Sequence, residues 1–278
     1  MDFYPLNLVL AVAVASATIF LGFLPTRNIR SEFLAREVSR AVFAWVLVAM
    51  ISPSAIRHYY FLLAFLCFGS WWQLRRDHAL SGKMWLSIAS GLGISIGIMF
   101  ILAITPRAYP PGLPQPGQGL LLASIYLGGA VIGLAYVCHV LTQGVFANSG
   151  IANGMVQRYV GLLGGLVFAR AGVLLTLLYL TPGMSGRFSV KSYSLPETHR
   201  IGHFSGGEID YIFGYSQDIT LPVQTIFLLG LILIILPTLA FVAKRALRTH
   251  AKTQATLALI GIWLLGIIAE TIARLLVL

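Results

Sequence analysis

The chain has 278 residues, of which 58% are hydrophobic and only 10% are charged. Soluble domains carry about 25% charged residues, so this composition, with a mean hydropathy of +0.85, excludes an ordinary soluble protein. The net charge of +10 does not indicate a nucleic-acid partner, because the basic residues lie mostly in short segments between apolar runs and form no single patch. The expected surroundings are a lipid bilayer.

Apolar runs of membrane-spanning length recur along the whole chain. They do not alternate polar and apolar residues as barrel strands do, so the sequence predicts an all-α polytopic membrane protein. About eight transmembrane helices are expected, at 6–25, 34–52, 56–73, 84–105, 118–143, 156–180, 221–243 and 253–277.

The second and third of these runs leave two alternatives open. Arg36, Glu37 and Arg40 lie near the start of the second run, and Pro53 ends it early. The two runs therefore either cross fully or form a tight, partly re-entrant hairpin.

The basic residues predict the orientation of the chain. Asp2 precedes the first run and basic residues only follow it, so we expect a retained span and not a cleaved signal peptide. Most of the 19 Lys and Arg residues lie in 26–40, 74–83, 144–158 and 244–252. Because basic loops face the cytoplasm, both termini are expected outside it, in a membrane of the bacterial inner type.

A Pro-rich segment, 106–117, divides the chain into a four-span half at 1–105 and a second half at 118–278 that contains a long outer loop, 181–220. The halves are expected to be two four-helix units, with a parallel duplication as one explanation and similar basic loops as the other. Glycines four residues apart predict close helix packing, at Gly93 with Gly97, Gly129 with Gly133, and Gly161 with Gly165.

Three ionisable residues lie deep in the last half of the chain. Arg170 and Glu270 are expected at a similar height in the outer half of the membrane, and Arg274 follows Glu270 by one turn on the same helix face. Glu270 is the only acid expected well inside a span. These residues predict a structural ion pair, a proton-handling pocket for a quinol-like ligand, or a subunit contact.

His139 is the only histidine expected within a span, with Gln143 one turn later. A haem with two histidine ligands needs both at one depth, and His58 lies near the opposite membrane face. We therefore expect no haem, and instead a polar interaction between His139 and Gln143 toward the inner surface.

The outer loop is too polar to span and unusually long for a connection. His199 and His203 have a spacing that a helix would turn into a metal site, but Gly202 lies between them, so no metal is expected. Docking of another membrane or periplasmic subunit on 181–220 is the preferred hypothesis.

The chain has no P-loop, HExxH or GxSxG motif. The leading hypothesis is a non-catalytic integral subunit of a larger complex, of an electron-transfer type by analogy of architecture alone, with quinone or lipid as the ligand. A secondary transporter or channel for a small solute is one alternative, and a membrane-embedded enzyme is another.

Overall fold

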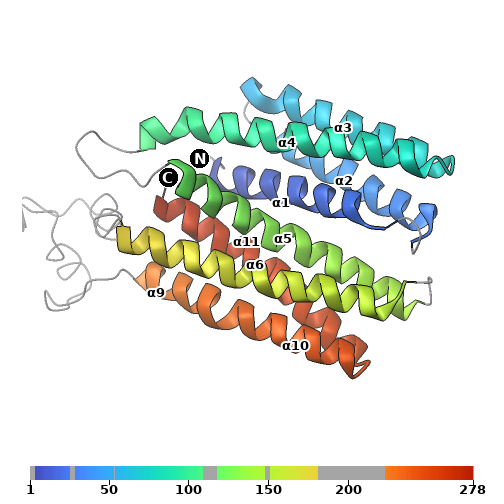
Figure 1. The fold of residues 1–278 in the computed structure, drawn as a ribbon. Coiled ribbons are helices and arrows are strands. Elements are labelled where there is room, and N and C mark those ends of the chain that lie inside the picture. The colour runs from blue at the N-terminus through green and yellow to red at the C-terminus, as the bar shows by residue number, and fades with distance from the viewer. Residues whose placement is uncertain are drawn as a thin grey trace, which may run out of the picture.

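The computed structural model describes residues 4–25, 29–52, 54–108, 118–147, 151–180 and 223–277, and these ranges are helical with no strand. The helices are α1 (Tyr4–Phe23), α2 (Ser31–Ile51), α3 (Ser54–Arg75), α4 (Ala79–Ala108), α5 (Gln118–Phe146), α6 (Asn153–Leu180), α9 (Val223–Gly230), the π-helical η3 (Leu231–Ile235), α10 (Leu236–Arg248) and α11 (Lys252–Val277). Because α9, η3 and α10 follow without a break, the described residues form eight long rods along one bundle axis (Figure 1). Their bounds lie within five residues of the eight expected runs, which confirms the all-α fold for the described ranges.

Four helical stretches are long and apolar enough to cross a membrane, namely Leu122–Phe146, Asn153–Thr176, Phe227–Arg248 and Lys252–Ala273, and Asn7–Phe23 is a shorter apolar helix. The helix α2 is not among them, because each stretch of 18 residues in it includes the three charged residues Arg36, Glu37 and Arg40, and a candidate span has at most two. The 21 residues of α2 nevertheless extend about 32 Å, close to the thickness of a hydrocarbon core. Several membrane-spanning helices therefore fit this chain, and crossing by all eight rods stays a prediction.

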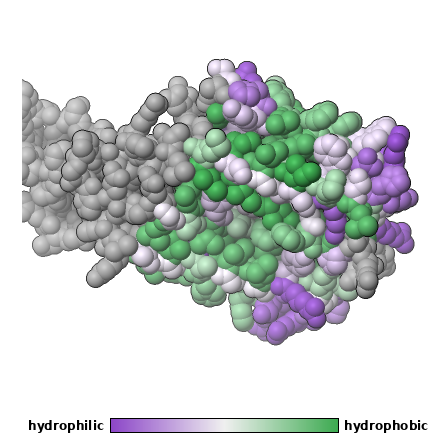
Figure 2. All heavy atoms as spheres, turned by 45° about the horizontal axis from the view of Figure 1, so that its top comes forward, coloured by the Kyte–Doolittle hydropathy of each residue, from purple (hydrophilic) through white to green (hydrophobic). Residues whose placement is uncertain are grey.

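The two ends of the bundle differ in character. The start of α1 and the end of α11 lie at one end, here called the terminal end (Figure 1). The ends of α1, α3, α5 and α10 and the starts of α2, α4, α6 and α11 lie at the other, here called the loop end. Hydrophobic side chains cover the middle of the bundle and hydrophilic ones gather mainly at the loop end (Figure 2). The basic segments and the termini thus lie at opposite ends of the bundle, as expected. The cytoplasmic location of the loop end stays a prediction.

The helices pack as two rings of four. In the first, α1 packs on α2, α2 on α3, α3 on α4, and α4 on α1; in the second, α5, α6, α10 and α11 repeat this order and α11 returns to α5. The first helices of the two rings, α1 and α5, pack against each other and form the seam between them. This arrangement is compatible with the two expected halves, and their origin by duplication remains a proposal.

Two glycines of α5 allow the close approach of α1 at this seam. A Cβ added to Gly129 would lie 2.3 Å from Cγ1 of Val12, and one added to Gly133 would lie 2.6 Å from the backbone N of Ala17. The prediction for this pair is confirmed.

The other two glycine pairs differ from the first. The prediction for Gly161 and Gly165 is wrong, because no described residue outside the backbone of α6 itself has an atom within 4 Å of an added Cβ at either position, so this side of α6 is open. At Gly93 the nearest atom would lie at an ordinary 3.5 Å. The surroundings of Gly97 lie outside the described residues.

Candidate functional site: two buried carboxylates and the cavities beside one of them

Arg170 of α6 and Glu270 of α11 form a buried ion pair. Nε of Arg170 donates to Oε1 of Glu270 at 2.6 Å, and Nη2 donates to Oε2 at 3.2 Å. The two residues are only 2% and 3% exposed. Arg170 lies 17 residues after the start of α6 and Glu270 lies 18 residues after the start of α11, so both are about 26 Å from the loop end. The equal heights predicted from the sequence therefore bring the two side chains together.

A third helix makes room for this pair. A Cβ added to Gly128 of α5 would lie 2.1 Å from Cδ of Glu270 and 2.2 Å from its Oε2. No side chain larger than hydrogen fits there while the carboxylate keeps its position. Gly128 therefore lets α5 close over the carboxylate, and the ion pair is enclosed where α5, α6 and α11 meet.

The neighbouring groups limit what the pair can do. Nη1 of Arg170 is buried and has no hydrogen-bond partner among the described residues. Arg274 lies on α11 one turn after Glu270, but its side chain lies outside the described residues. Two hydrogen bonds from one guanidinium fix the orientation of the carboxylate, which suits a fixed contact between helices.

Glu37 of α2 is a second buried acid, and the expectation that Glu270 is the only acid well inside a span needs correction. Glu37 is 0% exposed. Nη1 of Arg40 donates to its Oε1 at 3.0 Å and to its Oε2 at 2.8 Å, and Nε of Arg36 donates to Oε1 at 3.1 Å. Tyr136 of α5 adds a hydrogen bond to Oε2 at 3.2 Å. The acid is thus held by three donors from two helices.

The sequence carried a signal for this site. Glu37 stands between two arginines at the start of an apolar helix, and Arg40 follows it by three residues, which places both on one helix face. Arg36 and Arg40 belong to the basic segment 26–40, which the sequence predicts to be an inner loop. In the structure α2 begins at Ser31, so Glu37 lies about 9 Å into the helix and contacts Tyr136 of α5.

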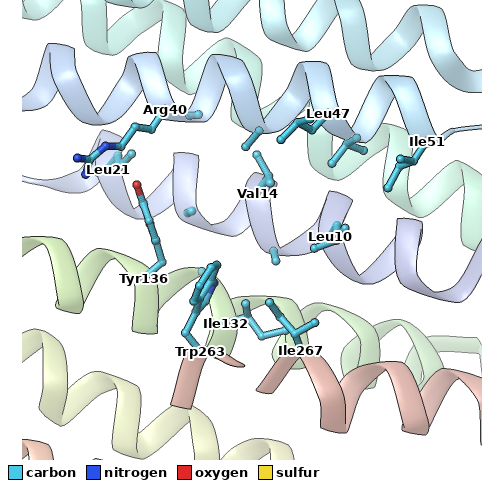
Figure 3. A pocket seen from close by; sticks show the side chains of 16 residues that line it. Leu10, Val14, Leu21, Arg40, Leu47, Ile51, Ile132, Tyr136, Trp263 and Ile267 are labelled. Carbon is cyan, nitrogen blue, oxygen red and sulfur yellow. The ribbon is translucent and has the colours of Figure 1, made fainter. Parts of the chain in front are cut away.

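Two cavities meet at Arg40, Tyr136 and Trp263. The larger, of about 470 Å³, lies between α1, α2, α5 and α11 and is lined by apolar side chains except at the end that Arg40 and Tyr136 form. Figure 3 shows these two residues and Trp263 toward one end of the cavity, with Leu10 and Ile51 toward the other. The smaller, of about 360 Å³, continues past the same three residues.

The smaller cavity contains the predicted inner-side pair. His139 and Gln143 of α5 line it, and their Nε2 atoms lie 3.0 Å apart, so the predicted interaction between them is confirmed. Nδ1 of His139 is buried and has no hydrogen-bond partner in the described part of the chain. These two residues thus belong with Arg40 and Tyr136 and not with Arg170 and Glu270.

The remaining predicted site residues are His199 and His203 in the outer loop. The whole of this loop, 181–220, lies outside the described residues. Among the residues that are described, no group of three or more His, Cys, Asp or Glu side chains could hold a metal ion.

No protein-family model, curated protein or solved structure matches this chain.

Proposed function

We propose that this chain is a non-catalytic integral membrane subunit of a larger complex. The observation that supports this most directly is the enclosed pair of Arg170 and Glu270, in which each charge serves the other. Buried ion pairs in membrane helices either serve a ligand path or join helices. Arg170 and Glu270 line neither of the two cavities beside Tyr136, and in this proposal the pair joins α6 to α11.

The surface of the described helices is compatible with the same role. Large apolar side chains are exposed on several helices, among them Phe43 at 70%, Phe65 at 65%, Phe168 at 66% and Phe241 at 65%. Such a surface suits lipid or another membrane subunit. In this proposal the polar segment 181–220 binds a partner outside the membrane, for which its length and polarity are the reasons.

The experiment isolates the chain at its natural level of expression in a mild non-ionic detergent and measures the mass of the particle. We expect a particle well above the 30.2 kDa of the chain after correction for detergent, with a second protein in fixed stoichiometry. Replacing 181–220 by a Gly/Ser segment of equal length should release that protein without changing the unfolding temperature of the bundle.

The matched control replaces 109–117 by a Gly/Ser segment of equal length, and it should retain the partner. A particle that contains only this chain in every mild detergent would contradict the proposal and favour the transporter alternative.

A further inference from the structure

The larger cavity has the shape of a groove for an apolar chain. It runs along α2 from Arg40 to Ile51, a separation of eleven residues that corresponds to about 16 Å. Its walls come from both rings, with α1 and α2 on one side and α5 and α11 on the other. A volume of about 470 Å³ lies within the usual range of sites for small molecules.

The groove opens sideways onto the surface of the bundle. Leu47 and Ile51 line it and are 63% and 45% exposed. In a bilayer this opening faces lipid, so an occupant enters from the membrane and not from water.

The end of the groove at Arg40 carries a net positive charge. Arg36 and Arg40 together face a single carboxylate, Glu37, which leaves one positive charge. Both guanidiniums are accessible, with side chains 58% and 51% exposed. Glu37 accepts from Arg40 through Nη1 alone, and Tyr136 donates to the same carboxylate.

Further polar groups lie beyond this point. The smaller cavity continues from Arg40 to His139 and Gln143. The exposed amide of Gln143 is available to a polar group there, whereas Nδ1 of His139 is buried. An apolar groove that ends at a cation and continues into a smaller cavity with several polar side chains complements an amphiphile with an anionic head.

We propose that this groove binds an anionic phospholipid, with one acyl chain along α1, α2, α5 and α11 and the phosphate at Arg40. Arg40 lies about 14 Å from the start of α2, and the smaller cavity continues from it to Gln143 near the end of α5 at the loop end, which gives the headgroup a polar path. The inference rests on the proposal that α1 and α2 cross the bilayer beside α5 and α11. It does not depend on the chain being a subunit of a complex.

The test measures lipid binding to the purified full chain by native mass spectrometry. The probe is an equimolar mixture of phosphatidylglycerol and phosphatidylcholine with identical chains, in a neutral detergent. We expect phosphatidylglycerol to bind about fivefold more tightly, the factor that corresponds to about 1 kcal/mol for one basic residue at a membrane surface.

Two pairs of variants test separately how the lipid headgroup and the acyl chain contribute to binding. Glu37→Gln and Glu37→Gln/Arg40→Gln differ only in the guanidinium of Arg40, and neither leaves an unpaired buried carboxylate. The first should keep or strengthen the preference for phosphatidylglycerol, and the second should weaken it most, because the remaining cation, Arg36, lines neither cavity. Ala44→Phe, which fills the groove, should weaken both lipids, whereas Ala169→Phe on the exposed face of α6 should weaken neither.

Equal binding of the two lipids to the unmodified chain would overturn the proposal. So would equal lipid binding by Ala44→Phe and Ala169→Phe, or displacement of both phospholipids by decylubiquinone at lower concentration than phosphatidylglycerol. A chain that binds phosphatidylglycerol as expected but purifies alone would support this inference while contradicting the proposed function.

Discussion

The two buried carboxylates in the described part of the chain are neutralised in different ways. Glu270 is held by Arg170, whose side chain is only 3% exposed, whereas Glu37 is held by Arg36 and Arg40, whose side chains are more than half exposed. The first pair joins two helices of one ring, and the second gathers mainly on α2 with Tyr136 reaching it across the seam. Two equally buried acids can therefore have different roles. An exposed arginine beside the acid can also bind a ligand, whereas a buried arginine is confined to the ion pair.

Breaking the enclosed pair tests this comparison most strongly. Glu270→Gln leaves the guanidinium of Arg170 buried without a carboxylate, and Arg170→Gln leaves the carboxylate without its cation. Removing one member of a buried pair costs about 3–5 kcal/mol, so we expect the unfolding midpoint in detergent to fall by about 10 °C, as measured by tryptophan fluorescence.

The double variant Arg170→Gln/Glu270→Gln is the control for this prediction, because it removes both charges. It should recover most of the lost stability, since two neutral amides leave no buried charge. Single variants as stable as the unmodified protein would show that the pair does not hold α6 to α11.

Gly128→Ala should have the next largest effect. The added methyl group meets the carboxylate of Glu270 at 2.1–2.4 Å, so either α5 or the ion pair must move, and overpacking of this kind costs about 1–3 kcal/mol. The same thermal unfolding measurement applies.

Gly161→Ala on α6 is the matched control, because no atom lies within 4 Å of its added Cβ. Alanine favours a helix over glycine by about 0.5–1 kcal/mol, so this variant should be neutral or slightly stabilised. If the two substitutions behaved alike, the enclosure of Glu270 by α5 would be contradicted.

Glu37→Gln should have the smallest effect of the three. Both arginines released from Glu37 are already more than half exposed on the surface of the bundle, so neither becomes an enclosed, unpaired charge. We expect a loss of about 1 kcal/mol or less, as for a solvent-accessible ion pair. A fall in the unfolding midpoint as large as that of Glu270→Gln would remove the distinction between the two sites.

The sequence predicted much of the fold and part of the candidate site. Hydrophobic run length located every rod, because a helix in a bilayer must be apolar over a fixed length. The match between Arg170 and Glu270 was also predictable, since depth along a helix follows from residue number. The small residues on α5 indicated close packing correctly, but Gly161 and Gly165 on α6 show that such spacing does not identify which helix faces a partner.

The sequence by itself therefore determined the helical class, the position of each rod, the grouping of the basic residues at one end and the height of the deep charges. These are properties of single helices, set by composition and by rise per residue. The tertiary structure alone decided which faces meet: that Gly128 encloses Glu270, that Glu37 is buried against Tyr136, and that a groove lies beside Arg40. These features depend on which face each helix turns to its neighbours. Lipid is as apolar as the helix surface, so the pattern of apolar residues does not specify that face.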